Sequence, residues 1–76
     1  MGLCIAAIQS MTYAVKAQKV LGFRRIESEV VKLDPSITER GCAWGIQFDC
    51  SMVDEVKRVL NNKGVPYGEI IGANRH

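Results

Sequence analysis

The three cysteines of this chain, Cys4, Cys42 and Cys50, are its best candidates for covalent chemistry. The thiolate, and not the thiol, is the form of cysteine that attacks other atoms. Cys42 stands out because, within "SITERGCAWGIQF", it follows Gly41 in a polar turn directly before an apolar run. Whether Cys42 packs or reacts is therefore the main functional question that the sequence raises.

Other catalytic residue sets are missing from the sequence. The single histidine, His76, is the last residue, so no Ser–His–Asp set is expected. No CxxC or Cys/His spacing indicates a zinc site, and we expect no bound metal. The glycines are spread singly, so no phosphate-binding loop and no cofactor are expected. Without an acid–base partner for a cysteine, the chain is predicted not to be an enzyme.

Length and composition indicate one small globular domain over residues 1–76. Hydrophobic residues make up 47% of the chain, enough for a core, and the net charge is +2. Acidic and basic residues alternate, whereas nucleic-acid binding usually requires clustered Lys and Arg, so no nucleic-acid partner is expected. No apolar run approaches the ~20 residues of a membrane span, and no membrane association is expected. The start lacks a basic signal-peptide region, which predicts a cytoplasmic protein with reduced cysteines.

The first half of the chain predicts a strand, a helix and a second strand. The apolar run 3–8 is typical of a buried strand. Ser10 is a predicted N-cap, and the apolar spacing within 13–21 gives one face of a helix. Gly22 is predicted to end that helix, and residues 27–33 are predicted to form the next strand.

The second half repeats this scheme. The alternating residues 43–48 predict a strand, and either Asp49 or Ser51 is predicted to cap the following helix. Residues 52–60 have the same helical spacing of apolar positions as the first helix, and "NNKG" is predicted to end the helix. Residues 67–72 are predicted to form the last strand.

The element order βαββαβ predicts an α+β, ferredoxin-like sandwich. Its four-stranded antiparallel sheet has the strand order 4-1-3-2, and two helices cover one face. The other face is predicted to be open, either as plain surface or as a partner surface, for instance in a homodimer. The predicted core contains Val20, Leu21, Trp44, Ile46, Val56 and Leu60.

This topology predicts the surroundings of Cys42. The start of the third strand lies beside the end of the first, so Cys42 is expected near Ser10 and Thr12 at a helix N-terminus. The alternation of side chains predicts that Cys42 points towards the helices. Unpaired N–H groups and the helix dipole favour a thiolate there. Arg40 is expected to add a positive charge, and Gly41 to leave the approach open.

The alternative for Cys42 is simple packing, since free cysteine is among the most buried residue types. Cys4 lies inside an apolar strand and is predicted to pack. Cys50 lies at a predicted helix start, at the same end of the sheet as Cys4, so these two residues are near enough to approach each other.

From "IAAIQSMTYAVKAQKVL" to "NNKGVPYGEII" the chain resembles the family described as putative selenium/sulfur carrier-like proteins. The resemblance implies that Cys42 bears sulfur or selenium as a persulfide or selenopersulfide, with donor and acceptor proteins as partners. The competing hypothesis is a non-catalytic interaction or regulatory module that uses the open sheet face. The residues that carry the resemblance are Ser10, Ala14, Ala17, Pro35, Cys42, Gly64, Val65 and Tyr67.

Overall fold

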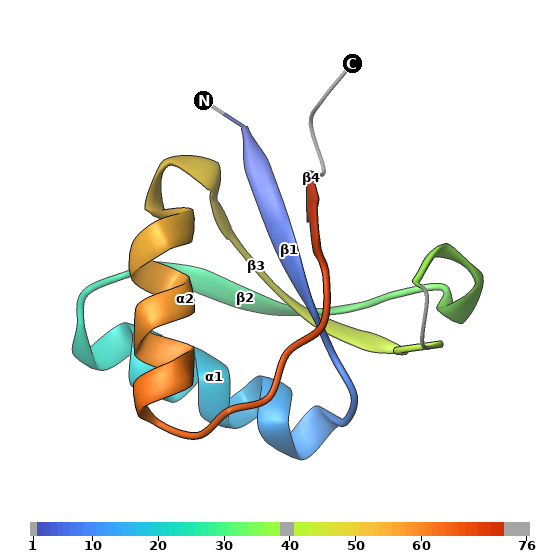
Figure 1. Cartoon of the computed structure of the whole chain (residues 1–76), viewed down its shortest axis with the longest axis horizontal. Coiled ribbons are helices and arrows are strands. Elements are labelled where there is room, and N and C mark those ends of the chain that lie inside the picture. Colours follow the sequence, from blue (N-terminus) through green and yellow to red (C-terminus); the bar gives the residue numbers. More distant parts are fainter. Residues whose placement is uncertain (1, 39–40, 73–76) are drawn as a thin grey trace.

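The chain folds into a four-stranded sheet with two helices (Figure 1). The computed structural model describes residues 2–38 and 41–72. Two short 3₁₀ turns, η1 and η2, are added to the predicted order. The elements are β1 (Leu3–Ile8), α1 (Met11–Phe23), β2 (Ser28–Lys32), η1 (Pro35–Ile37), β3 (Trp44–Asp49), η2 (Cys50–Met52), α2 (Val53–Asn62) and β4 (Ile70–Gly72).

The sheet has the strand order β2-β3-β1-β4, and every neighbouring pair is antiparallel. Counted from the β4 edge, this is the order 4-1-3-2 expected from the sequence. The central pair runs from Leu3 opposite Asp49 to Ile8 opposite Trp44. The α+β class, the antiparallel sheet and the two helices are thus confirmed.

The main core lies between the sheet and the helices. Alternate residues of β1 and β3 face this layer because strand side chains alternate between the two faces. Five of the six predicted core residues are buried, and Trp44 is half-buried, with the Lys32 ammonium 5.6 Å from its ring centre. The sheet contributes Cys4, Ala6, Ile8, Ile46 and Phe48 to this core, and the helices contribute Ala14, Ala17, Val20, Leu21, Val56, Val59 and Leu60.

The opposite face of the sheet has a smaller apolar cluster of its own. Ile5, Ala7, Val31 and Leu33 pack there, and Ala7 is fully buried. Gly45 lies beneath them, where a Cβ would come within 2.6 Å of Ile5 Cγ2 and 3.1 Å of Leu33 Cδ1. The missing side chain lets these two residues fold down over the sheet, so this face is partly covered by its own side chains.

The helix starts differ from each other. Ser10 caps α1 as predicted, with its hydroxyl accepting from the Tyr13 N–H at 3.2 Å. The prediction that Asp49 or Ser51 caps α2 is wrong. Asp49 caps η2 instead, accepting from the Ser51 N–H at 2.9 Å, and α2 begins after Met52 without a side-chain cap.

The helix ends share one hydrogen-bond pattern but differ in the residue that turns the chain. The prediction that Gly22 ends α1 is wrong, because the helix continues to Phe23 and the left-handed residue is Arg25, with φ +61°. In α2 the left-handed residue is Gly64, with φ +70°, as "NNKG" predicts. Both ends are closed by a backbone bond, from Ile26 N–H to Leu21 O at 3.0 Å and from Val65 N–H to Leu60 O at 2.9 Å.

Candidate functional site

Cys42 is buried on the sheet face opposite the helices. Only 4% of the residue is exposed, and it packs with Ala7 and Leu33. The prediction that Cys42 points towards the helix layer is therefore wrong. The alternation of side chains holds only within a strand, and β3 begins at Trp44. Cys42 and Ala43 lie before that strand, and Gly41 has φ +69°, so the chain reaches Cys42 from a left-handed turn and not from an extended strand.

A threonine four residues earlier fixes the backbone of Cys42. The Cys42 N–H donates to Thr38 Oγ1 at 2.6 Å. The same hydroxyl lies 3.3 Å from the Pro35 carbonyl oxygen and 3.4 Å from the Cys42 carbonyl oxygen, and it donates its one proton to either. Thr38 is itself buried, so this pairing satisfies polar groups that water does not reach. Thr38 was not predicted as a site residue, because a single threonine in a loop belongs to no periodic pattern.

Cys42 lines a small cavity of about 60 Å³ together with Gln9 and the segment 66–68. This segment is held beside the end of β1, because the Gly68 N–H donates to the Ala7 carbonyl oxygen at 2.8 Å. This segment was not predicted to belong to the site, although the strand order indicates its position. The strand β4 is antiparallel to β1, so the residues before β4 must lie at the end of β1.

The structure brings together only some of the predicted site residues. Gly41 is exposed and directly precedes Cys42. Ser10 and Thr12 lie at the start of α1, as expected, but neither is among the described residues that line the cavity. Arg40 lies outside the described residues, so its predicted charge beside Cys42 stays a prediction.

The other two cysteines are joined in a disulfide. The prediction that all three cysteines are reduced is wrong for Cys4 and Cys50, although their expected proximity is confirmed. Their Cα atoms are 5.0 Å apart because Cys4 lies opposite Phe48, two residues before Cys50. The Cys50 N–H also donates to the Gly2 carbonyl oxygen at 2.9 Å. Cys4 is buried as predicted, and Cys42 remains the free cysteine of the described chain.

A cluster of metal-ligand side chains and a helix able to span a membrane are both absent from the described part of the chain. Within residues 2–38 and 41–72, no three side chains of the His, Cys, Asp and Glu types come together as metal ligands would. The same residues include no helix with the length and apolar character that crossing a membrane requires.

The comparison with protein families gives the class of the protein. The family model described as "Putative Se/S carrier protein-like" matches residues 3–71. The chain therefore belongs to this family, and the match includes Thr38, Cys42 and the segment 66–68. Neither the curated proteins nor the solved structures gave a match to the chain.

Proposed function

We propose that this protein carries a single sulfur or selenium atom on Cys42 and delivers it to another protein, without catalysing a reaction of its own. The observation that carries the proposal is the combination of the family match with one unpaired cysteine in the described chain. The disulfide occupies the sulfur atoms of the other two cysteines, so Cys42 is the cysteine left for the cargo.

In the proposed transfer, the Cys42 thiolate attacks the outer sulfur of a persulfide on a donor protein. A new S–S bond forms at Cys42, the donor's S–S bond breaks, and the donor leaves as a thiolate. A nucleophile on the acceptor then attacks the outer sulfur of Cys42, and the Cys42 thiolate leaves. Each step moves one sulfur between thiolates, so neither step needs an external oxidant or reductant. Selenium follows the same route as a selenopersulfide.

The surroundings of Cys42 support a small cargo held away from solvent. The thiol is buried, and the adjoining cavity of about 60 Å³ has room for a small group and not for a peptide. Burial protects a persulfide from solution thiols, which would otherwise remove its outer sulfur. It also means that donor and acceptor reach Cys42 only through local opening of the chain around it.

The proposed partners are the donor and acceptor proteins, and the proposed location is the cytoplasm. We further infer a ferredoxin-like arrangement, which the 4-1-3-2 strand order supports.

The alternative function is an interaction module that forms a homodimer through the sheet face opposite the helices. There Leu3 is 42% exposed, and Ile5 and Val31 are half-buried. Sedimentation at increasing protein concentration tests this, and a constant monomer mass contradicts it.

Intact-mass spectrometry after treatment with glutathione persulfide or glutathione selenopersulfide tests the carrier proposal. We expect the untreated mass plus one sulfur or selenium atom, with the added atom on Cys42 after digestion. The matched control is Cys42→Ser, which keeps the disulfide and is expected to gain nothing. An unchanged wild-type mass, or equal labelling of Cys42→Ser, contradicts the proposal.

A further inference from the structure

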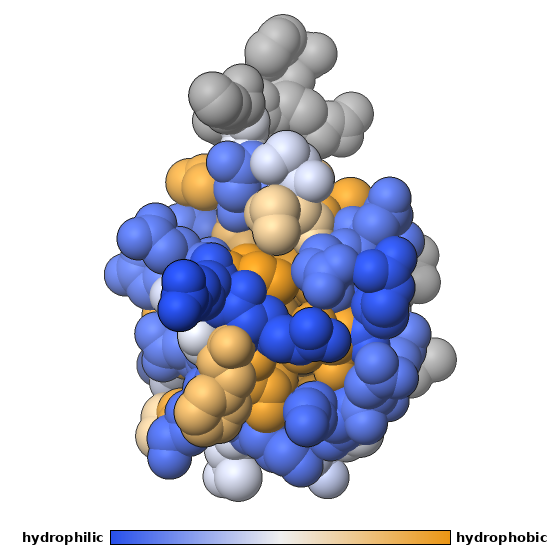
Figure 2. Space-filling model, turned by 90° about the vertical axis from the view of Figure 1, so that its left-hand side faces the viewer, coloured by the Kyte–Doolittle hydropathy of each residue, from blue (hydrophilic) through white to orange (hydrophobic). Residues whose placement is uncertain are grey.

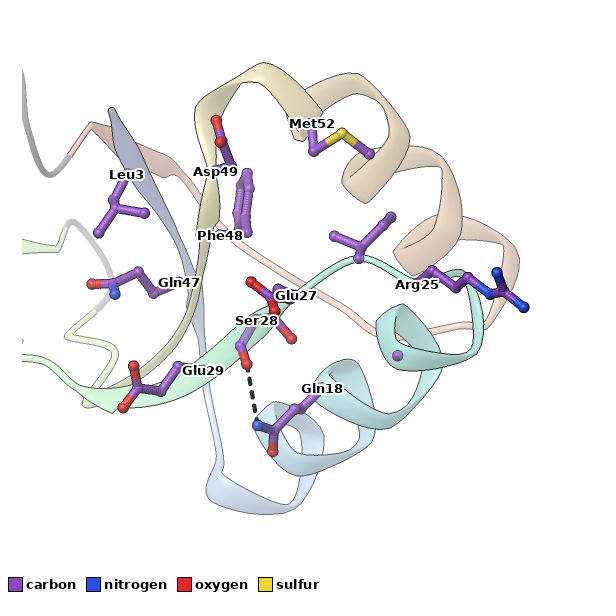
Figure 3. Close-up of a pocket in the computed structure, with 12 residues that line it drawn as sticks. Leu3, Gln18, Arg25, Glu27, Ser28, Glu29, Gln47, Phe48, Asp49 and Met52 are labelled. Carbon is purple, nitrogen blue, oxygen red and sulfur yellow. Dashed lines mark hydrogen bonds between the residues drawn. The ribbon is translucent and has the colours of Figure 1, made fainter. Parts of the chain in front are cut away.

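A wide groove lies at the opposite end of the sheet from Cys42, where β2 begins and β3 ends. It has a volume of about 1080 Å³. Figure 2 shows apolar side chains in the middle of this side of the molecule, with hydrophilic side chains around and partly across them. In Figure 3 the lining comes from both faces of the sheet, with Leu3, Gln47 and Glu29 on one side of the β2–β3 ribbon and Ser28, Gln18 and Met52 on the other.

The groove has an apolar floor. Phe48 and Ile26 line it and are themselves buried, so they form its base. Leu3 and Met52 add apolar surface that water reaches, with Leu3 42% exposed. A side chain inserted between these residues removes apolar surface from water, which is the main favourable term in most protein association.

The charged rim of the groove is mostly acidic, although the whole chain carries a net charge of +2. Glu27, Glu29 and Asp49 line the groove, and none of the three forms an ion pair within the described residues. Hydrogen bonding from the Ser51 N–H lowers the pKa of Asp49, so this carboxylate is ionised at neutral pH. Arg25 is the one cationic side chain among the described residues of the lining, and Figure 3 shows it extending away from Glu29.

The groove also borders a free sheet edge. Among the described strands, β2 is the outer strand of the sheet and pairs only with β3. At its first residue, the Ser28 carbonyl oxygen already accepts from the Gln18 side-chain amide at 3.2 Å, as Figure 3 shows. The outer backbone groups of an edge strand pair readily with an extended peptide, which then lies along the groove.

We propose that this groove binds an extended basic segment of a partner protein, with Lys or Arg side chains against the carboxylates and one apolar side chain on the Phe48 floor. Charge complementarity selects this occupant over an acidic segment, because the three carboxylates of the rim repel like charge. The site is at the far end of the sheet from Cys42, so the proposal does not depend on the carrier function.

Peptide titration with detection by amide chemical shifts tests this proposal. The probe is the peptide KVKLKVK with blocked ends, and its comparison is EVELEVE. We expect the basic peptide to bind at submillimolar concentration and to shift the amides of Glu27, Ser28 and Phe48. Added salt is expected to weaken its binding, since the rim charges are exposed to solvent. The acidic peptide is expected not to bind.

Two pairs of variants locate the site. Glu29→Lys reverses a charge on the rim, whereas Asp54→Lys makes the same change on the exposed first turn of α2, outside the groove. We expect Glu29→Lys to weaken binding roughly three- to tenfold and Asp54→Lys to change it less than twofold. Gly22 lines the groove and has open space at its Cβ position, so Gly22→Phe adds a bulky side chain to the lining, whereas Gly22→Ala adds only a methyl group.

The outcomes that overturn the proposal are distinct. Equal weakening by Glu29→Lys and Asp54→Lys shows a general charge effect without a site. Unchanged binding to Gly22→Phe, with Gly22→Ala as the folded control, places the peptide elsewhere. Shifts that depend on protein concentration without peptide assign the groove to a second copy of this chain. Absence of any preference for KVKLKVK over EVELEVE removes the basic partner.

Discussion

The two ends of the β1–β3 pair differ in the state of their cysteines, which form a disulfide at one end and include a free thiol at the other. At one end, Cys4 and Cys50 are bonded to each other, and the disulfide joins β1 to the first residue of η2. At the other end, Cys42 is unbonded, buried against Ala7 and beside a small cavity. Burial is similar for Cys4 and Cys42, so what distinguishes them is whether a second sulfur is within reach.

Both ends nevertheless use the same local device to turn the chain. Asp34 accepts a hydrogen bond from the Ser36 N–H at 3.0 Å, and Asp49 accepts one from the Ser51 N–H at 2.9 Å. Each aspartate starts a 3₁₀ turn. Local sequence is thus alike at the two ends, and the different fates of their cysteines come from tertiary neighbours.

The largest effect is expected from reduction of the Cys4–Cys50 disulfide. The disulfide closes a span of 46 residues, for which the loss of chain entropy in the unfolded state is worth about 4 kcal/mol. A domain of this size has a total stability of roughly 3–5 kcal/mol, so reduction is expected to bring it close to unfolding. Urea unfolding with and without a phosphine reductant measures this.

The control for this prediction is the double variant Cys4→Ala, Cys50→Ala. It is expected to unfold at low urea and to be insensitive to the reductant, because Cys42 has no bonded partner. A wild-type midpoint that does not move on reduction, while free thiols are shown to have formed, contradicts the stabilising role of the disulfide.

A smaller effect is expected at the unbonded end. Thr38→Val keeps the side-chain shape but removes the acceptor of the Cys42 N–H, which leaves a buried donor unpaired. The expected loss is about 1–3 kcal/mol in unfolding free energy. Loss of this hydrogen bond is also expected to make local opening around Cys42 more frequent, and so to speed the reaction of its thiol with iodoacetamide. Both quantities are measured on Thr38→Ser as the matched control, since serine retains the hydroxyl. Equal labelling rates for the two variants would show that the Thr38 hydroxyl does not limit access of iodoacetamide to the Cys42 thiol.

The sequence predicted the elements well where local signals are strong. The run 3–8 is the strand β1 with no change of bounds, and five of six predicted core residues are buried. Gly64 ends its helix as predicted because only glycine adopts the left-handed conformation at low cost. The same reasoning gave the wrong end for the first helix, because the left-handed residue there is Arg25 and not Gly22. The sequence has no feature that indicates a left-handed arginine at this position.

The site was harder to predict because its contacts are not periodic. The position of Cys42 beside the end of β1 followed from the strand order, but its side of the sheet did not. That side is set outside β3, because the strand alternation begins only at Trp44 and Cys42 directly follows the left-handed residue Gly41. The sequence left undecided whether Cys4 and Cys50 form a disulfide, for a similar reason. The predicted strand order placed both residues at one end of the sheet, but the register that aligns them is known only from the structure.

The smallest expected effect compares the two aspartate turns by pH. The pKa of Asp34 and of Asp49 is lowered below its usual 3.8, in each case chiefly by the backbone N–H of the serine two residues on. The unfolded chain therefore binds protons at a higher pH than the folded chain does. The stabilisation is fully present above pH 3.8 and is lost as the pH falls through the lowered pKa values of the folded state.

The variants Asp34→Asn and Asp49→Asn keep an acceptor oxygen without the charge. Each is therefore expected to reduce the dependence of the unfolding free energy on pH at acidic pH. Denaturant unfolding at a series of pH values between about 6 and about 2 measures both slopes. Equal flattening supports one shared device at both ends, whereas flattening by only one variant shows that the other turn is held by its tertiary neighbours.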